Sequence, residues 1–528
     1  MTTHDEMARL LAMGRIGRRD LIKGAAALGA VGAAERVLGR SAMAATPNKG
    51  GALKVAIGAG STTDTLDPAT FTDSYMQSVG FGGMRNCLTE IDNTGKLVGE
   101  LAESWDASPD AKTWTFKIRK GVTFHNGKSL TAEDVIDSIN HHRGEDSKSP
   151  AKPLLAPITS LKADGDNVVL TLEAGNADLP YLLSDYHIGI MPSSGDGKVD
   201  WKSGAGTGGY IIKAFEPGVR SFLERNPNYW KQGRAHFDSV EILSIIDVAA
   251  RTNALTTGEV HLMDRCDLKT VHLLKRNRDV EIYDVTGTQH YTFPMLTNQA
   301  PFDNNDLRLA LKYSVNREEM VQKILRGHGK VGNDTPIAPA TSFYAELEQR
   351  AYDPDKAKFH LKKAGAEGLT IDLSAADAAF AGAVDAAVLY KEHAAKAGIT
   401  VNVIREPNDG YWSNVWMKKG WSACYWGGRP TADWMFSTAY EAGVAWNDTY
   451  WEHEKFNKLL VAARVELDEA KRTDMYREMQ TIVRDEGGVV VPMFANYVGA
   501  SSTKLAHDKL AGNWDMDGHK AVERWWFA

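Results

Sequence analysis

The spacing of apolar residues changes near residue 300, and this change limits how the chain can fold. Before that point, short strand-like runs alternate with Gly, Asp and Asn, at residues 53–58, 113–124, 167–175, 209–218 and 240–246. In the second run Trp114, Phe116 and Ile118 alternate with polar residues, which is typical of a half-buried strand. Thr131, followed by acidic residues, is the expected N-cap of a helix. The first half is therefore predicted to be rich in strands.

The second half has helical spacing. Residues 305–327 place their apolar side chains on roughly one helical face, and residues 353–364, 376–397 and 454–485 have a similar pattern. Short β-branched runs lie between and after them, at 369–374, 399–404 and 488–494. Alternating strands and helices indicate an α/β unit with a largely parallel sheet.

The first half thus has a strand-like pattern and the second half a helical one, and a strand-like tail follows that ends in Trp525-Trp526-Phe527. Together these features predict two lobes. We expect lobe I to comprise residues 45–294 and 497–528, and lobe II to comprise residues 295–496. The chain should then cross between the lobes near 292–299 and again near 491–497.

The N-terminal residues 1–44 have the order of an export signal. Arg18-Arg19 is followed by x-Leu-Ile-Lys, then by a weakly apolar Gly/Ala stretch and by Ala42-Met43-Ala44. The paired arginines resemble the signal of the twin-arginine pathway, and cleavage is expected after Ala44. The apolar run is short and contains Glu35, which argues against a membrane anchor. The predicted location is therefore the periplasm, without a lipid anchor, since no cysteine lies near the cleavage site.

Charge and cysteine content exclude several classes of protein. Residues 1–44 hold seven Lys/Arg and four Asp/Glu, so cleavage changes the formal net charge from −7 to −10. A mildly acidic protein is a poor partner for nucleic acid. The three cysteines are far apart, which indicates neither a disulfide framework nor a metal or redox motif.

The sequence also lacks the motifs of common enzymes and metal sites. Gly204 to Gly209 match G-x-G-x-x-G, but a strand pattern follows instead of the helix that a dinucleotide site requires, so we expect a tight turn. His141 and His142 are adjacent and cannot share one helical face as a chelating pair. We therefore predict a protein that is not an enzyme, without a cofactor and without a bound metal.

Six stretches in register resemble the extracellular solute-binding proteins of family 5, the peptide and nickel receptors of ABC importers. They are Leu66-Asp67-Pro68 and residues 101–135, 206–230, 254–263, 302–321 and 476–491. The resemblance implies the type II periplasmic-binding-protein fold of the large peptide-receptor class, with two α/β lobes joined by two hinge strands. It also implies a monomer that closes on a ligand and delivers it to an inner-membrane permease and ATPase.

The resemblance directs attention to YWGGRPTADW, residues 425–434. In the family's peptide receptors a W-x-x-D-Y segment supplies a pocket tryptophan and an aspartate that holds the peptide ammonium group. Here Trp426 matches the tryptophan, but Gly427 and Gly428 lead to Arg429 where the aspartate is expected. Because a guanidinium repels an ammonium group and binds carboxylates, an acid-bearing ligand is predicted.

Other residues complete the predicted ligand site. Asp433 is either the partner of Arg429 or an anchor for a ligand amine, and Gly427 and Gly428 allow close approach of the backbone. Apolar walls and further contacts are expected from Tyr425, Trp446, Asn447, Trp412, Tyr75 and Asp73, with Arg85 as a second cation.

Three functions remain open at this point. The preferred one is a receptor for a peptide or amino-acid-derived acid, for example an opine-type conjugate. The others are a metal-chelate receptor of the nickel type and, less favoured, a periplasmic hydrolase, because fold alone does not determine function.

Overall fold

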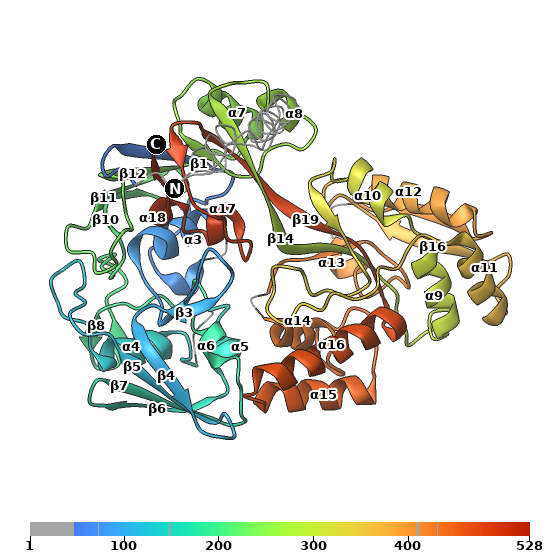
Figure 1. Cartoon of the computed structure of the whole chain (residues 1–528), viewed down its shortest axis with the longest axis horizontal. Coiled ribbons are helices and arrows are strands. Elements are labelled where there is room, and N and C mark those ends of the chain that lie inside the picture. Colours follow the sequence, from blue (N-terminus) through green and yellow to red (C-terminus); the bar gives the residue numbers. More distant parts are fainter. Residues whose placement is uncertain (1–46, 72, 146, 148, 408–410, 430) are drawn as a thin grey trace, which may run out of the picture.

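The computed structural model describes residues 47–528, except 72, 146, 148, 408–410 and 430 (Figure 1). The predicted export signal, with Arg18, Arg19 and Ala44, lies outside the described residues. Two α/β bodies stand side by side in Figure 1 and are joined by two long strands. We keep the names lobe I and lobe II for them.

The largest sheet has nine strands and contributes to both lobes. Its strand order is β10-β11-β12-β1-β13-β19-β14-β18, and β15 pairs with β19 off this path. Only β1 pairs in parallel, with β12 and β13, and its residues Leu53, Val55 and Ile57 are fully buried, as expected for a central strand. The strands are β1 (Ala52–Ile57), β10 (Tyr210–Glu216), β11 (Arg220–Arg225), β12 (Ser239–Ser244), β13 (Leu262–Met263), β14 (Val280–Pro294), β15 (Gly329–Val331), β18 (Cys424–Trp426) and β19 (Val489–Ser502).

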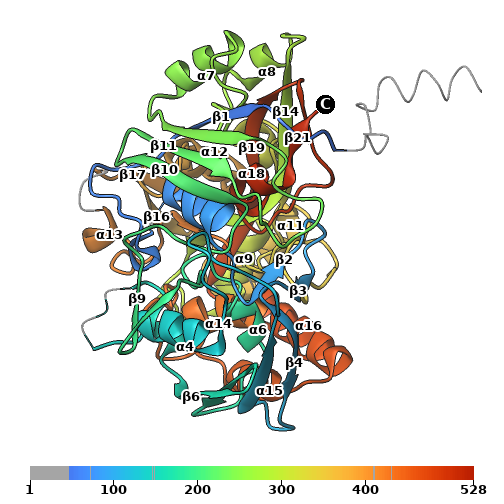
Figure 2. The same cartoon turned by 90° about the vertical axis from the view of Figure 1, so that its left-hand side faces the viewer.

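A second sheet lies at the other end of lobe I from α7 (Val248–Thr256) and α8 (Val271–Leu274), as Figures 1 and 2 show. Its antiparallel order is β4 (Ala102–Ala107), β5 (Thr113–Ile118), β7 (Asn167–Leu172) and β6 (Ile158–Asp164). Trp114, Phe116 and Ile118 are buried, which confirms the predicted alternation. They pack with α4 (Ala132–His141), whose capping box joins Thr131 and Asp134 and confirms the predicted N-cap.

Short elements complete lobe I. They are η1 (Pro68–Thr70), α3 (Ser74–Gln77), the π-helix η2 (Ser78–Met84), β2 (Thr89–Ile91), β3 (Leu97–Gly99), α5 (Lys152–Leu155), α6 (Leu179–Leu182), β8 (Ser193–Gly195) and β9 (Lys198–Val199).

The backbone of the glycine-rich segment 204–209 packs closely against the backbone of Met84, the last residue of η2. A Cβ atom on Gly206 would lie 2.1 Å from Met84 O, and one on Gly208 would lie 2.4 Å from the Met84 carbonyl carbon. Gly208 N donates to Met84 O, and β10 follows directly. The strand predicted to follow is confirmed, and glycine is required here for close packing.

Lobe II is mostly helical, as predicted, but two of the expected helices are interrupted. The segment 305–327 forms α9 (Asn305–Tyr313) and α10 (Arg317–Lys323), because the Asn316 side chain caps a new helix. The segment 454–485 likewise forms α15 (Glu454–Val465) and α16 (Glu469–Glu486), with Asp468 as the second N-cap. The remaining helices are α11 (Pro354–Lys363), α12 (Ala383–Ala395), α13 (Tyr411–Asn414) and α14 (Ala432–Ala439).

The largely parallel sheet expected for lobe II is reduced to one pair of strands. β16 (Thr370–Ala375) and β17 (Thr400–Arg405) pair in parallel. Isolated bridges from Ser422 to Ser374 and from Trp421 to Met295 connect this pair to the large sheet. The prediction was wrong in this respect because the third strand-like run, 488–494, became part of the antiparallel β19.

The two long strands β14 and β19 are the connections between the lobes (Figure 1). They pair from Val280↔Ser502 to Pro294↔Val489, and the register is interrupted between Thr286 and His290. After β19 the chain continues in lobe I through β20 (Leu505–Ala506), the short α17 (Asp515–Gly518), α18 (Ala521–Arg524) and β21 (Trp526–Phe527).

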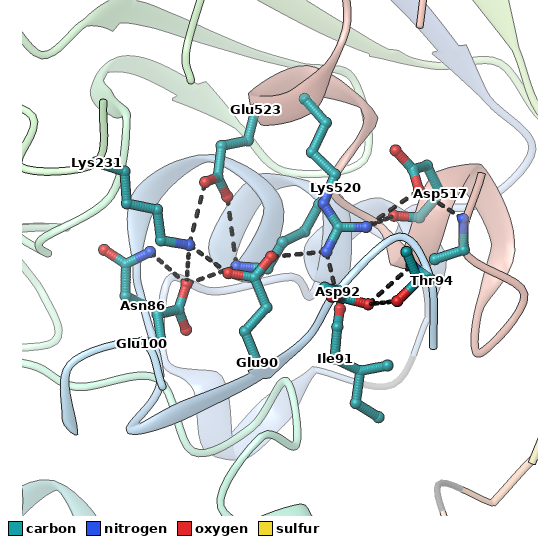
Figure 3. A network of polar contacts seen from close by, with 12 residues as sticks. Asn86, Glu90, Ile91, Asp92, Thr94, Glu100, Lys231, Asp517, Lys520 and Glu523 are labelled. Carbon is teal, nitrogen blue, oxygen red and sulfur yellow. Dashed lines mark hydrogen bonds and ion pairs between the residues drawn. The ribbon is translucent and has the colours of Figure 1, made fainter. Parts of the chain in front are cut away.

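A buried network of charges, which we call the lobe I ion cluster, holds this C-terminal return in place (Figure 3). Lys520 Nζ lies 2.9 Å from Glu100 Oε1, and Arg524 Nη2 lies 2.6 Å from Glu90 Oε1. Lys231 pairs with Glu90, Glu100 and Glu523 together. Coulombic attraction from the cations outweighs burial and holds the pKa of Glu90 well below its usual range. Each of these buried carboxylates is thus paired with a cation. Burial of an unpaired charge would be strongly destabilising.

We expect Lys231→Met to destabilise the fold by about 3–5 kcal/mol, because three buried carboxylates lose a cation. Chemical denaturation followed by circular dichroism measures the free energy of unfolding. Lys120→Met is the matched control, since Lys120 and Asp166 form an exposed pair, and its midpoint should equal that of the wild type. Equal midpoints for both variants would show that the lobe I ion cluster contributes nothing.

Candidate ligand site

The segment Tyr425–Arg429 lies beside the strand that joins the lobes. β18 pairs antiparallel with β14, with Trp426 opposite His290 and Tyr425 opposite Tyr291. This pairing places the aromatic cluster at the edge of the large sheet, next to the interruption between Thr286 and His290. The chain then turns at Gly427 and Gly428.

Three segments of the molecule meet at Gly428. A Cβ atom there would lie 1.6 Å from Thr288 Oγ1 and 3.6 Å from Asn513 O, so only glycine fits. Thr288, in the interrupted part of β14, donates a hydrogen bond to Asn513 O at 3.3 Å. Gly428 therefore permits close approach to β14, one of the strands that connect the lobes. This contact also brings lobe II against the C-terminal return of lobe I, which contains Asn513.

Arg429 is half-buried at this junction and carries an uncompensated charge. Its guanidinium lies 6.0 Å from the ring centres of Trp426 and Trp434, and it donates at 3.3 Å to Gly427 O and Gly428 O. In the part of the chain that the structure describes, no carboxylate forms an ion pair with it. Burial lowers the pKa of Arg429, while Tyr186 and Asp185 of lobe I act in the opposite direction. Charges of lobe I therefore act on this cation.

The opposing surface of lobe I is an aromatic cluster that the sequence did not indicate. Tyr186 packs edge-on against Trp514 at 5.3 Å, and Trp514 packs against Phe81 at 5.8 Å and against His519 at 5.9 Å. These residues come from segments that are far apart in the sequence, and no local pattern connects them. Their rings form an apolar wall on lobe I, and Trp514 follows Asn513, whose carbonyl oxygen lies beside Gly428.

On lobe II, three exposed aromatic side chains continue from Trp426. Tyr425, Trp412 and Trp446 are 40%, 41% and 51% exposed. Trp412 packs edge-on against Tyr425 at 5.7 Å, and Trp446 lies 6.2 Å from Trp426. The structure thus brings together four of the predicted aromatic residues.

A buried carboxylate fixes the orientation of Trp426. Asp448 Oδ2 accepts hydrogen bonds from Trp426 Nε1 at 3.1 Å and from Trp416 Nε1 at 3.3 Å. Burial raises the pKa of Asp448 to about 6, although both indole donors oppose this shift. Asp448 is therefore a positioning residue for the ring that packs beside Arg429.

The predicted site residue Asp433 has its partners within lobe II. It is buried in α14, 3.3 Å from Arg464 Nε of α15, and Ser437 Oγ donates to it. Of the two alternatives that the sequence left open, the pair with Arg429 is not formed among the described residues, because Arg464 is the partner of Asp433.

Three further predicted residues have structural roles, and we remove them from the candidate site. Tyr75 is fully buried, with its hydroxyl bonded to Ser221 Oγ at 2.9 Å. Asp73 caps α3 through Tyr75 N. The Asn447 amide donates to Trp451 O at 2.7 Å and accepts from Thr449 Oγ1. Arg85, the predicted second cation, is also buried inside lobe I, where Gly189 packs against its side chain, and no hydrogen-bond partner for its guanidinium is found among the described residues.

The lobes also touch at a second place, which we call the seam contact. Asp178 of lobe I forms a buried ion pair with Arg472 of α16 at 2.5 Å. Ala177 N donates to Arg464 O at 2.6 Å, and the hydroxyls of Ser342 and Tyr181 are 3.2 Å apart. Figure 1 shows α6 facing α14 and α16 at this place. The structure is therefore a closed arrangement of the lobes.

Other possible sites lie elsewhere or are not indicated. Two cavities of about 340 and 220 Å³ lie beside β16 and β17, around Ser374 and Glu406, away from Arg429. Apart from the gaps, residues 47–528 contain no group of three His, Cys, Asp or Glu side chains that could hold a metal ion. None of the helices described there has both the length and the apolar character of a membrane span.

Comparison with known proteins explains this architecture. Residues 96–448 match the family described as bacterial extracellular solute-binding proteins, family 5. The chain belongs to this family. The predicted resemblance and the two-lobed α/β fold of periplasmic binding proteins are thereby confirmed, and the protein is a member of a family of solute receptors.

Several characterised family 5 proteins are similar over most of their length. The glutathione-binding protein GsiB of Pectobacterium atrosepticum is 26% identical over 85% of this chain and 90% of its own. The di/tripeptide-binding protein 1 of Pseudomonas aeruginosa is 25% identical over 84% of this chain and 89% of its own. The structure of AgaA of A. tumefaciens R10 with agropinic acid superposes with a TM-score of 0.71, at 22% identity, over 90% of this chain and 99% of its own.

We expect Asp178→Asn to open the ligand-free protein, because Arg472 would remain buried without its partner. Loss of one partner of a buried pair costs about 3–5 kcal/mol, and 3 kcal/mol changes the ratio of open to closed molecules by roughly a hundredfold. Small-angle X-ray scattering should show a larger radius of gyration. Glu478→Gln, which removes the exposed partner of Lys455 within lobe II, is the control and should not change it. An unchanged radius for Asp178→Asn would contradict the role of the seam contact.

Asp448 also predicts a pH dependence of stability. Its pKa is higher in the folded protein, about 6, than the ordinary value of 3.8, so folding favours the protonated form. The stabilisation is therefore complete below pH 4 and is lost as the pH rises towards about 6. Relative to Asp448→Asn, the wild type should lose roughly 2 kcal/mol of unfolding free energy between pH 4 and pH 7.

Urea denaturation at several pH values measures this difference between the two proteins. Because Asp433 and Asp515 also have raised pKa values, only the difference between wild type and variant isolates Asp448. Parallel stability curves for the two proteins would contradict the assignment.

Proposed function

We propose that the protein is an exported, monomeric periplasmic receptor of an ABC importer. It captures an acid-bearing peptide or amino-acid-derived solute, such as an opine-type conjugate, by closure of the two lobes, and delivers it to a membrane permease and its ATPase. The sequence around Arg18 and Arg19 supports export by the twin-arginine pathway without a lipid anchor. Family membership supports the importer partners.

The observation that carries the choice of solute is the charge at Arg429. Burial lowers the pKa of the neighbouring His290 to about 4 and that of His519 to about 3, so both are neutral at pH 7. Neither histidine then adds a positive charge beside Arg429, and the nearby carboxylate of Asp185 is paired with His187, so Arg429 is the group that can bind a ligand carboxylate. A carboxylate completes its hydrogen bonds, whereas an ammonium group is repelled.

The ligands named for similar proteins are consistent with a positive charge at the site. The names of the relatives specify glutathione and di- or tripeptides, and the AgaA complex contains agropinic acid. All of these compounds carry carboxylate groups. A site that binds the ammonium group of a peptide places an aspartate after the pocket tryptophan. The present protein has the cation of Arg429 beside Trp426 instead, so the acid end of the solute should lie there.

The remaining affinity comes from apolar enclosure. Tyr425, Trp412 and Trp446 on lobe II and Trp514 on lobe I present rings that can cover a small solute. The ligand stabilises the closed state only through contacts that the open state lacks. A solute that touches both lobes at the junction fulfils this condition.

We expect Arg429→Ala to weaken binding of acids by about 10- to 100-fold, the range for a charge-assisted hydrogen bond of ~1.5–3 kcal/mol. A thermal-shift screen of peptides, opine-type conjugates, sugar acids and amines identifies ligands of the wild type. The same compounds are then titrated against the variant.

Arg276→Ala is the control, because Arg276 is exposed on lobe I. It should retain every shift of the wild type. If cations without an acid group bind best and the Arg429→Ala variant binds them equally well, the proposed charge preference is wrong. Turnover of a bound compound would instead indicate a hydrolase.

A further inference from the structure

The Tyr186 hydroxyl at the junction has no partner within the protein. Among the residues that the structure describes, none hydrogen-bonds with it, although the ring is largely buried. His519 Nδ1 and Asn513 Oδ1 are also buried there without a partner, whereas the groups next to Tyr186 in the chain are bonded. Cys87 Sγ donates to Asp185 O, and His187 contacts both Phe71 O and Asp185. An unbonded tyrosine hydroxyl at the edge of an aromatic wall is available to a ligand.

The Tyr186 ring is fixed on several sides. It packs against His187 at 4.2 Å, against Trp514 at 5.3 Å and against His519 at 6.3 Å. His187 is in turn held by Phe71 O at 2.9 Å. The hydroxyl therefore has a defined position before any ligand arrives, which reduces the ordering cost of binding.

Two contacts of the junction connect Tyr186 to Arg429. Trp514 packs on Tyr186, and its neighbour Asn513 accepts the hydrogen bond of Thr288 and lies against Gly428. Gly428 directly precedes Arg429. Consistent with this path, burial raises the pKa of Tyr186 while the Arg429 charge lowers it.

Asp185, the carboxylate of lobe I that acts on Arg429, is bonded within its own lobe. His187 Nδ1 lies 2.6 Å from Asp185 Oδ1, and His187 Nε2 lies 2.9 Å from Phe71 O. Among the described residues Asp185 pairs with His187 and not with Arg429, so the guanidinium keeps donors for a ligand carboxylate.

We propose that the Tyr186 hydroxyl of lobe I and the Arg429 guanidinium of lobe II bind the same carboxylate of the ligand. This clamp rests on the proposed function and specifies it further. The acid group of the solute bridges the lobes, with two donors of different charge on one anion. A carboxamide in its place loses the charge-assisted bond to Arg429, and the lobes lose a bond that only the closed state makes.

The test uses acetate, succinate, Ala-Ala and glutathione as probes. Each is titrated against the full-length mature protein and its Tyr186→Phe and Arg429→Ala variants, by thermal shift and by isothermal calorimetry for the acid with the largest shift. We expect the Kd of that acid to rise about 10-fold in Tyr186→Phe. The control is Tyr352→Phe, which removes a hydroxyl bonded to His393 O within lobe II and should leave the Kd unchanged.

The carboxamide of the best acid supplies a second comparison. Its weaker binding should be the same in wild type and Tyr186→Phe to within about twofold, because the clamp needs the anion. The ligand-free melting temperature of Tyr186→Phe should equal that of the wild type, since the lost hydroxyl has no partner. A lower melting temperature would mean that the hydroxyl bonds within the protein, and would overturn the clamp.

The outcomes also separate the clamp from the proposed function. Equal Kd values for Tyr186→Phe and wild type, with a large loss in Arg429→Ala, would reject the clamp but support the acid receptor. No loss in either variant, or no shift with any acid in the wild type, would reject both.

Discussion

The antiparallel pair of β14 and β19 is the constraint on which the rest of the molecule depends. Both strands run through both lobes, and the register changes between Thr286 and His290. Such an interruption re-aims side chains and weakens the ladder locally, which suits a point where two bodies move relative to each other. Because β18 adds to β14 beside the interruption, Trp426, Gly428 and Arg429 lie at the same point. The candidate site is thus a consequence of where the connecting strands are irregular.

The other half of the site depends on the lobe I ion cluster. Trp514 lies on the chain after β19, which has to be held against lobe I to form the aromatic wall. Lys520 and Arg524 provide this attachment through Glu100 and Glu90, residues that are more than 400 positions away in sequence. A buried ion pair contributes little to stability compared with an apolar contact of equal volume. Its directional bonds explain why the return adopts one position.

The sequence predicted local features well because they depend on nearby residues. The alternation of Trp114, Phe116 and Ile118 and the Thr131 cap need only neighbouring positions. The aromatic segment at Trp426 was likewise recognisable as a candidate. Tyr186 and Trp514 were not, because only the completed topology brings them together. Tyr75 was misjudged for the same reason, since its hydroxyl is bonded to Ser221, 146 positions away. The Asn447 amide is instead bonded within its own segment, to Thr449 and to the Trp451 carbonyl oxygen.

The lobes meet at the seam contact and at the junction of Arg429, and these two contacts contribute differently to the free energy of closure. The seam contact between Asp178 and Arg472 involves residues of the protein alone, so it favours the closed state independently of the solute. A solute then needs to supply only the remaining difference, and a receptor whose closed form is already populated binds with less loss of intrinsic affinity. The junction at Arg429 has the opposite property, because its charge is unpaired until an anion arrives. Closure at the seam therefore favours binding in general, and the unpaired guanidinium determines which solute benefits from it.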